Sequence, residues 1–304
     1  MDIKKYEVFL SALEKGCFAK VCEELGYTQP AITSMMKSME REIGFPLLKR
    51  SNKGIQLTHE GREVLPLIRE LVRVNNLLNQ RYDMLRGIET GHICVGVFPT
   101  VATAWMPKII SRFEKKYPHI EIDLVEENSI HRLEEWLTNG QIDIAFFARQ
   151  PYHNYKWIHL KHDPYYALLP PEHPLTSFDQ VPAEEFRDQP FLMCRSNEGP
   201  DEDITRYFGE KNIPIKPRFT SNQDFTIVYM VKEGLGLAVL PELIVKTLNM
   251  TTASDVEVRP LKPAFHRELG IALRQGEEKS PALSRFIDCV KSMSLELNGP
   301  FSYD

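Results

Sequence analysis

A cluster of hydrogen-bonding side chains begins just after Gly26, where one helical pattern ends and another starts. Hydroxyl, amide and ammonium groups follow at helical spacing, and such groups can pair with base edges in a major groove or with phosphates. The candidate DNA-reading residues are Thr28, Gln29, Pro30, Thr33, Ser34 and Lys37. The same pattern also suits a helix that binds nothing, with Thr28 or Gln29 as its cap and Lys37 as a solvated charge.

Three amphipathic helices would hold these side chains in place. Apolar residues recur at helical spacing over residues 2–14 and 18–25, and a glycine follows each segment as a stop signal. Pro30 suits the first turn of a third helix because it has no N–H to leave unpaired, and this helix is expected to end at Gly44. The order predicts a helix-turn-helix.

A basic edge follows the third helix. Residues 47–57 predict two short strands around a turn at residues 52–54, which together form a wing. Residues 43–59 contain Lys49, Arg50 and Lys53 and no acidic side chain. We expect Arg50 and Lys53 to reach phosphates or a minor groove.

A long helix is predicted beyond the wing, from a cap at Thr58 toward Gly87. Pro66 lies inside it and should kink it or mark an irregular turn. A single apolar stripe along such a helix has little to pack against in its own chain. The sequence therefore predicts pairing with other copies, in a homodimer or homotetramer.

Strands and helices alternate in the rest of the chain. The expected strands cover residues 92–98, 120–125, 142–148, 165–169, 235–240 and 269–273, and the expected helices cover residues 100–117, 129–139, 226–232 and 282–293. This order predicts an α/β domain with a parallel or mixed sheet covered by helices.

Composition narrows the class of protein. A chain of 304 residues suggests about two domains. Residues 1–86 carry 14 Lys and Arg against 11 Asp and Glu, a net +3, whereas the remainder carries a net −8, so only the first part favours phosphates. The chain lacks an apolar run long enough for a membrane span, an apolar signal core and a CxxC pair among its five cysteines, so we expect a cytoplasmic protein without membrane contact.

The chain resembles the LysR-type transcriptional regulators over nearly its whole length. The motifs that carry the resemblance in the first part are FAKVCEEL (18–25), TQPAIT (28–33), LLKR (47–50) and LTHEG (57–61). Those in the second part include GQIDIA (140–145), HPL (173–175) and GLGLAVLP (234–241). Ser34 and the pair Met35-Met36 depart from the family pattern, so base preferences cannot be copied from a relative.

The resemblance implies an α/β fold in three parts: an N-terminal winged helix-turn-helix (residues 1–58), a linker helix for dimerisation (59–88) and a two-lobed, type 2 periplasmic-binding-protein-like effector domain (89–304). Lobe I is expected at about residues 89–162 and 266–304, and lobe II at about 163–265. The resemblance also implies a regulator that binds double-stranded DNA and responds to a small-molecule effector.

The same resemblance places the effector, a carboxylate or other small anion, in the cleft between the lobes. Helix N-termini offer unpaired N–H groups to an anion, which selects Thr100, Asn128 and Ser129. Further contacts are expected from Arg149, Cys194, Ser196 and Phe225. The alternative is that Asn128 and Ser129 only cap a helix and that Arg149 is a surface charge.

Two other functions stay open. The resemblance also allows a redox-responsive regulator that uses Cys194, since one branch of the family uses paired cysteines in the second lobe, although no second cysteine is close to Cys194 in sequence. A cytoplasmic solute-binding protein would use only the second part of the chain and would leave the winged helix-turn-helix without a purpose. His153, His159 and His162 lack the partners of a standard metal site, and the chain shows no phosphate loop or nucleophile elbow, so we predict no metal, no cofactor and no enzymatic activity.

Overall fold

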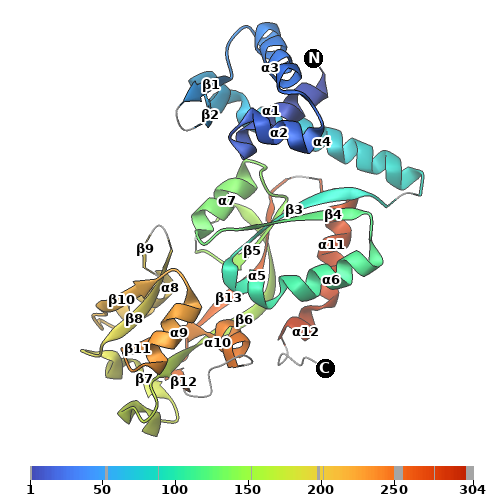
Figure 1. The fold of residues 1–304 in the computed structure, drawn as a ribbon. Helices are drawn as coiled ribbons and strands as arrows, with labels where there is room; N and C mark the ends of the chain where they lie inside the picture. Colours follow the sequence, from blue (N-terminus) through green and yellow to red (C-terminus); the bar gives the residue numbers. More distant parts are fainter. Residues whose placement is uncertain are drawn as a thin grey trace. The chain divides into compact units, whose positions relative to one another are not determined.

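The structure is a computed structural model that describes residues 2–51, 54–87, 89–151, 153–196, 199–200, 202–249, 256–276 and 278–298 (Figure 1). The chain forms two compact units, which are described separately. The first unit comprises Met1–Glu89 with two short segments, Thr138–Gln141 and Lys279–Pro281, and the second unit comprises the remainder. Within the described ranges, no helix is both long and apolar enough to cross a membrane.

Three helices surround one small core in the first unit. They are α1 (Ile3–Lys15), α2 (Phe18–Leu25) and α3 (Gln29–Ile43). The helices meet around fully buried apolar side chains, among them Val8, Phe9, Val21, Ile32 and Met39. The predicted order of three short amphipathic helices is therefore confirmed.

The predicted wing is present as an antiparallel pair, β1 (Leu48–Ser51) and β2 (Gly54–Leu57). A side chain of α3 holds the start of the wing, because Oε1 of Glu40 accepts hydrogen bonds from the backbone N–H groups of Leu47 at 2.8 Å and Leu48 at 3.1 Å. The wing is thus attached to the helix that carries the predicted base contacts.

A second anchor joins the wing to the end of α1. The backbone N–H of Ile55 donates to the carbonyl oxygen of Gly16 over 2.9 Å. Gly54 has a φ of +98°, and a Cβ atom on it would lie 2.6 Å from the same carbonyl oxygen. Both the backbone conformation and the close approach therefore require glycine at position 54.

The long helix α4 (His59–Leu85) follows the wing. Thr58 caps it: its hydroxyl oxygen accepts from the N–H of Gly61 at 2.9 Å and donates to the carbonyl of Pro46 at 2.8 Å. Pro66 lies inside the helix, which continues through it. Exposed apolar side chains follow α4 at spacings of three and four residues: Leu67, Leu71, Val74, Leu78, Tyr82 and Leu85.

One path of hydrogen-bonded strands runs through the second unit in the order β10-β8-β11-β6-β13-β5-β3-β4. These strands are β3 (Gly91–Val97), β4 (Ile120–Glu126), β5 (Ile144–Ala148), β6 (Tyr155–Leu169), β8 (Phe191–Ser196), β10 (Pro217–Ser221), β11 (Leu237–Pro241) and β13 (His266–Arg274). The short strands β7 (Val181–Pro182), β9 (Gly199–Pro200) and β12 (Glu257–Lys262) pair off this path. Parallel and antiparallel pairs both occur, which confirms the mixed sheet.

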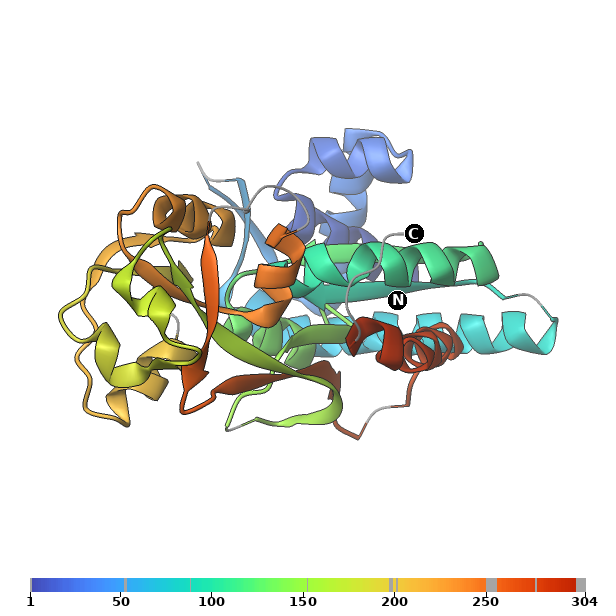
Figure 2. The same cartoon turned by 90° about the horizontal axis from the view of Figure 1, so that it is seen from below.

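The strand β6 runs through both lobes of the second unit. Its residues up to Pro164 pair with β13, and those from Tyr165 onward pair with β11 and β12. Figure 2 shows β6 and β13 passing between the lobes. Lobe I holds β3 to β5, α5 (Pro99–Ala104), α6 (Met106–Lys116), α7 (Ile130–Thr138), α11 (Pro281–Ser292) and α12 (Ser294–Asn298). Lobe II holds the strands β7 to β12 and the helices α8 (Glu202–Gly209) and α9 (Asp224–Lys232). It also holds two short 3-10 turns, η1 (Pro174–Ser177) and η2 (Ala183–Phe186). The helix α10 (Glu242–Asn249) follows β11.

Helices cover both faces of the lobe I sheet. Ile144 and Phe146 of β5 belong to the core shared with α6 and α11, whereas Ala145 and Phe147 belong to the core under α7. Successive side chains of a strand point to opposite faces, which explains why the whole strand is apolar. Lobe II has separate cores of its own.

The predicted helix over residues 100–117 is interrupted. The structure has α5 and α6 on either side of Trp105. Pro107 explains the break, because proline supplies no N–H for a continuous helix and its ring clashes with the carbonyl one turn earlier. The interruption ends α5 after six residues.

Candidate functional site

An exposed stripe runs along α3. Pro30, Ser34 and Lys37 are solvent-exposed, while Ile32, Met36 and Met39 on the opposite face are buried. Pro30, Ser34 and Lys37 lie at spacings of four and three residues, which places them on one side of the helix. Arg41, four residues beyond Lys37, is exposed on the same stripe.

The N-terminus of α3 is capped by Thr28. Its hydroxyl oxygen accepts from the N–H of Ala31 at 3.4 Å, and Gln29 and Pro30 form the first turn. Thr28 and Gln29 are exposed, and Thr33 is partly buried. The cap and the exposed side chains therefore coexist, since a hydroxyl that accepts from the backbone keeps its own O–H as a donor.

The structure describes only some of the basic side chains of the wing. The backbone of Arg50 is part of β1, but its side chain is outside the description, and Lys53 lies outside the described residues altogether. Lys49, on the same strand, is exposed. The predicted contacts of Arg50 and Lys53 stay predictions.

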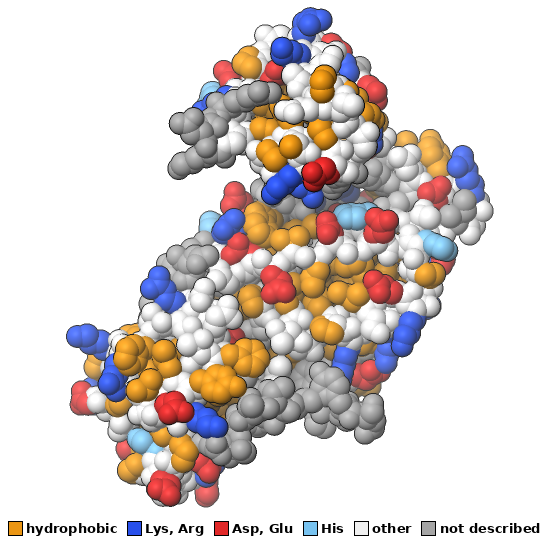
Figure 3. Space-filling model, viewed as in Figure 1, with side chains coloured by type: hydrophobic (Ala, Val, Ile, Leu, Met, Phe, Trp, Pro, Cys, Tyr) orange, Lys and Arg blue, Asp and Glu red, His pale blue; other side chains and the backbone are white. Residues whose placement is uncertain are grey.

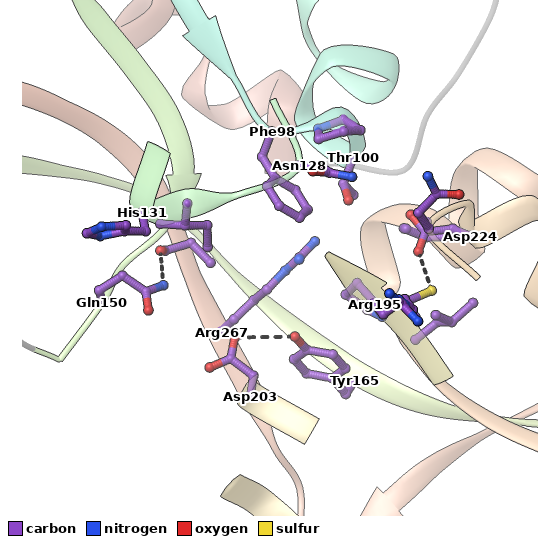
Figure 4. A pocket seen from close by; sticks show the side chains of 18 of the residues that line it. Phe98, Thr100, Asn128, His131, Gln150, Tyr165, Arg195, Asp203, Asp224 and Arg267 are labelled. Carbon is purple, nitrogen blue, oxygen red and sulfur yellow. Dashed lines mark hydrogen bonds between the residues drawn. The ribbon is translucent and has the colours of Figure 1, made fainter. Parts of the chain in front are cut away.

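A cavity of about 550 Å³ lies between the two lobes of the second unit. Lobe I contributes Phe98, Thr100 and Asn128, as well as side chains from α7, and lobe II contributes residues of β8 and the starts of α8 and α9 (Figure 4). The volume is in the range of sites for small-molecule ligands.

Arg267 is the central cation of this cavity. It lies at the start of β13 directly opposite Asp163 of β6, and its Nε and Nη2 atoms are each 3.0 Å from Oδ2 of Asp163. The Arg267 side chain is 8% exposed and that of Asp163 is 0% exposed. Oδ1 of Asp163 accepts from the N–H of Leu243 at 2.9 Å, which ties the first turn of α10 to the same pair.

The lobe II wall holds acids that already have partners. Asp203 accepts hydrogen bonds from Arg206 and, at 3.5 Å, from the hydroxyl of Tyr165. The thiol of Cys194 donates to Oδ1 of Asp224 at 2.8 Å. Burial raises the pKa of Asp224.

Three of the predicted effector residues line the cavity: Thr100, Asn128 and Cys194. In Figure 4, Thr100 and Asn128 lie next to each other, and the Arg267 side chain reaches into the space between them and Asp224. Thr100 is buried at the start of α5. The cavity therefore brings together predicted residues that are far apart in the sequence.

Three other predicted effector residues are not among those that line the cavity. Ser129 is 1% exposed and its hydroxyl oxygen accepts from the N–H of Arg132 at 3.1 Å, so it caps α7. The guanidinium of Arg149 pairs with Glu268 at 3.2 Å on the surface, and Phe225 is 41% exposed to solvent. The side chain of Ser196 is outside the description.

The sequence interpretation missed several cavity residues, above all Arg267. Nothing around it in the sequence marks it, because it is a single basic residue ahead of an apolar strand. Arg206, His131 and Glu134 were also missed. For the last two a signal existed: they lie three residues apart on the predicted helix that Asn128 precedes, so they share one face of it.

The histidines named in the sequence analysis fall into two separate ring contacts in the structure. The ring centroids of His159 and His162 are 4.4 Å apart, and those of His162 and His266 are 5.0 Å apart. His153 instead stacks on Tyr155 at 4.3 Å. Burial and the neighbouring His162 lower the pKa of His159. Among the described residues, no group of three or more His, Cys, Asp or Glu side chains is arranged to hold a metal ion.

Comparison with protein families gives the same assignment for both parts of the chain. The family described as "Bacterial regulatory helix-turn-helix protein, lysR family" matches residues 3–62. The family described as "LysR substrate binding domain" matches residues 86–294.

Individual relatives match over nearly the whole chain. The HTH-type transcriptional regulator YvbU of Bacillus subtilis (strain 168), described as uncharacterized, is 32% identical over 295 residues, which cover 96% of this chain and 99% of YvbU. The HTH-type transcriptional activator CmpR of Synechocystis sp. is 26% identical over 290 residues, covering 94% of this chain and 93% of CmpR.

Solved structures show the same fold. A full-length OxyR variant from Pseudomonas aeruginosa has a TM-score of 0.76 at 22% identity and covers 100% of this chain and 98% of its own. Full-length CbnR in complex with its target DNA has a TM-score of 0.62 at 18% identity and covers 96% of this chain and 99% of its own. The predicted fold class, a winged helix-turn-helix with a linker helix and a two-lobed α/β domain, is confirmed. The chain belongs to the LysR family of bacterial transcriptional regulators, which bind DNA through the helix-turn-helix and carry an effector-binding domain.

Proposed function

We propose that this regulator reads its DNA site with the exposed stripe of α3 and that a small anionic effector, held at Arg267 in the cavity between the lobes, sets its activity. The observation that carries the effector proposal is the buried guanidinium of Arg267 facing that cavity. A guanidinium recognises carboxylates and phosphates with directed N–H donors.

The charges around the cavity support an anion. Arg195 and Arg206 line it together with Arg267. Burial raises the pKa of Asp224 and of Glu134, so burial opposes the charged forms of both acids. Thr100 and Asn128 add polar contacts from lobe I, and Cys194 adds one from lobe II.

The DNA contacts are proposed residue by residue. The amide of Gln29 pairs with an adenine edge, Pro30 contacts a thymine methyl group, and Ser34 and Thr33 bond bases or phosphates. Lys37 contacts a phosphate, as do Arg50 and Lys53 on the wing. CbnR, which shares this fold, was solved in complex with its target DNA, which supports the placement of such a head on DNA.

The linker helix supports assembly into a homodimer or homotetramer. Its exposed apolar side chains recur at alternating short spacings, with Leu67, Leu71, Val74 and Leu78 between 46% and 72% exposed. Such a stripe is the seam of a helix pair. The effector domain offers further surface: β4 and β10 are the edge strands of the sheet, and Leu124, Phe219 and Tyr229 are exposed on or beside them. Figure 3 shows apolar side chains on the visible face around β4 and around β10.

The proposal is tested by fluorescence anisotropy on DNA from the region upstream of the protein's own gene, with and without small carboxylates, and by thermal shift with the same acids. We expect specific binding, a change in its affinity or footprint with at least one acid, and a raised melting temperature with that acid. Thr100→Val should weaken the response to the acid and leave DNA affinity unchanged, because the residue lies in the other unit. Absence of specific DNA binding under all conditions would overturn the DNA proposal, and absence of any acid effect would overturn the effector proposal.

A redox response at Cys194 is the second candidate, favoured by the placement of the thiol in the cavity and by its contact with Asp224. None of the five cysteines, all of which lie in the described ranges, forms a disulfide. Cys194→Ser separates the two functions: a redox regulator loses its response to peroxide, whereas an effector-controlled regulator keeps its response to the acid.

A further inference from the structure

The helix proposed to read DNA carries two acidic side chains near its end, Glu40 and Glu42. A negative charge close to the phosphate backbone lowers affinity by repulsion. Glu42 forms an ion pair with Lys5 of α1. Glu40 instead accepts hydrogen bonds from the backbone at the start of the wing, so the two acids have different roles.

Glu40 lies at the boundary between the exposed and the buried side of α3. Its side chain is partly buried, whereas Lys37 is exposed and Met39 is buried. Glu40 follows Lys37 by three residues, and residues three apart are neighbours on a helix surface. The wing is therefore attached to α3 one turn beyond the phosphate contact proposed for Lys37.

The backbone that Glu40 holds is fixed from two directions. Oε1 of Glu40 accepts from the N–H of Leu47 at 2.8 Å and from that of Leu48 at 3.1 Å. The carbonyl oxygen of Leu47 accepts from the N–H of Thr58 at 3.0 Å. The helix α4 also approaches this carbonyl so closely that a Cβ atom on Gly61 would lie 2.3 Å from its oxygen. Leu47 thus joins α3, the wing and α4, and Glu40 is the α3 member of this junction.

Two backbone N–H groups depend on the one oxygen atom of Glu40. Hydrogen bonds to a charged acceptor are stronger than those to a neutral one, and a buried N–H group that loses its acceptor is destabilising. Without Glu40, the start of β1 must move toward water to satisfy these groups. The hydrogen bond from Ile55 to Gly16 still holds β2, so we expect the wing to tilt relative to α3 rather than to unfold.

We infer that Glu40 is a positioning residue for DNA binding, which fixes the wing to α3 so that both meet the phosphate backbone at the same time. The inference rests on the phosphate contact proposed for Arg50, which follows Leu48 by two positions on β1. Contacts made by rigidly joined elements cost less ordering than contacts made by elements that move independently. Loss of the link therefore removes the wing contact and leaves the base contacts of α3 in place.

Salt titrations of DNA affinity test this with the full-length protein, by fluorescence anisotropy on the duplex from upstream of the protein's own gene. Glu40→Met keeps the length of the side chain and removes its acceptor, so the slope of log affinity against log salt concentration should fall by about one unit or more. Glu40→Gln keeps an acceptor oxygen at the same reach and should retain the parent's slope. Glu42→Met removes the same charge from the same helix without touching the wing, and as the matched control it should also retain that slope.

A double-mutant cycle with Arg50→Ala separates positioning from folding. Arg50→Ala alone should lower the slope by about one unit. Its addition to Glu40→Met should lower the slope no further, because the wing contact is already lost. The affinity penalty for base-pair changes in the site, which reports the α3 contacts, should be the same in all variants. A residue that only stabilises the fold would instead lower the melting temperature and the affinity at an unchanged slope.

The outcomes separate this inference from the proposed wing contact. If Glu40→Met is folded and keeps the parent's slope, or if its effect adds to that of Arg50→Ala, Glu40 does not position the wing and the Arg50 contact stands. An equal fall in Glu40→Gln assigns the effect to charge and also overturns the inference. If Arg50→Ala keeps the parent's slope, the wing contact itself is wrong and the inference fails with it. Should Glu40→Met melt too low for the titration, Glu40→Asp, which shortens the reach of the carboxylate by one methylene, replaces it with the same expected and opposing results.

Discussion

Replacement of Arg267 by methionine tests whether the cation of the cavity is also a structural element. The change removes the guanidinium and leaves Asp163, whose side chain is 0% exposed, without its ionic partner. The N–H of Leu243 remains as a donor to Oδ1. Oδ2, which lies 3.0 Å from Nε and 3.0 Å from Nη2 of Arg267, loses both of these contacts.

The magnitude follows from the burial of the pair. Breaking a buried ion pair by removing one partner costs about 3–5 kcal/mol, because the remaining charge stays desolvated. Screening by solvent reduces this little here, since the Arg267 side chain is only 8% exposed. For a domain of about 150–250 residues, each kcal/mol lowers the melting temperature by roughly 2–4 °C. We therefore expect Arg267→Met to melt roughly 6–20 °C lower.

The double variant Asp163→Asn with Arg267→Met is the control. Asparagine keeps an acceptor for the N–H of Leu243 and carries no charge, so the double variant should recover more than half of the lost stability. Circular dichroism melts of the full-length proteins measure the difference. A single variant within about 2 °C of the parent, or a double variant no more stable than the single one, would falsify the role of a desolvated ion pair.

The same variant predicts a pH dependence. Burial raises the pKa of Asp163, and Arg267 opposes this rise. Without Arg267 the folded-state pKa moves further above its unfolded value, so the folded state takes up a proton more readily. A group with a raised folded-state pKa stabilises below that value and loses this contribution as pH rises through it. The stability deficit of Arg267→Met should therefore be smaller at pH 5 than at pH 8; an equal deficit at both would contradict the charge argument.

Three further predictions concern the first unit. Lys37→Ala should lower the slope of log affinity against log salt concentration by about one unit, whereas Lys115→Ala, exposed on α6, should leave it unchanged; equal slopes for Lys37→Ala and the parent would remove the phosphate contact. Gly54→Ala should weaken DNA binding about tenfold or more without shifting the melt of the effector domain, because the added Cβ forces the wing away from Gly16; unchanged anisotropy would show that the wing adds nothing to affinity. Leu78→Glu should shift the sedimentation equilibrium toward monomer, and an unaltered oligomer would exclude α4 as the seam.

The DNA-reading head was largely predictable because its signals are local. Gly26, Thr28 and Pro30 are a stop, a cap and a first-turn residue within five positions, and each acts through its own backbone geometry. The turn at residue 54 is also local, although its close approach to Gly16 is a tertiary contact that no short pattern could show.

The cavity was predictable only in part, because its residues come from segments that lie far apart in the sequence. Thr100 and Asn128 were found since each precedes or opens a helix, but the same rule selected Ser129, whose hydroxyl is used to cap α7. Arg267 carried no local signal. Its role depends on the register of β13 against β6, which sets it opposite Asp163, and register between distant strands is not written in either strand alone.

The register that sets Arg267 of β13 opposite Asp163 of β6 has a mechanical consequence. Arg267 lies on β13 and Asp163 on β6, the two strands that pass between the lobes, and Asp163 also holds the first turn of α10 through Leu243. An anion that binds the guanidinium therefore contacts the connection between the lobes rather than one wall alone. A ligand shifts a conformational equilibrium only by its difference in affinity for the two states. Thr100 lines the cavity from lobe I and Asp224 from lobe II, so an effector bound at the proposed site that contacts both walls would favour one lobe spacing over others, and this would be its physical means of altering the oligomer.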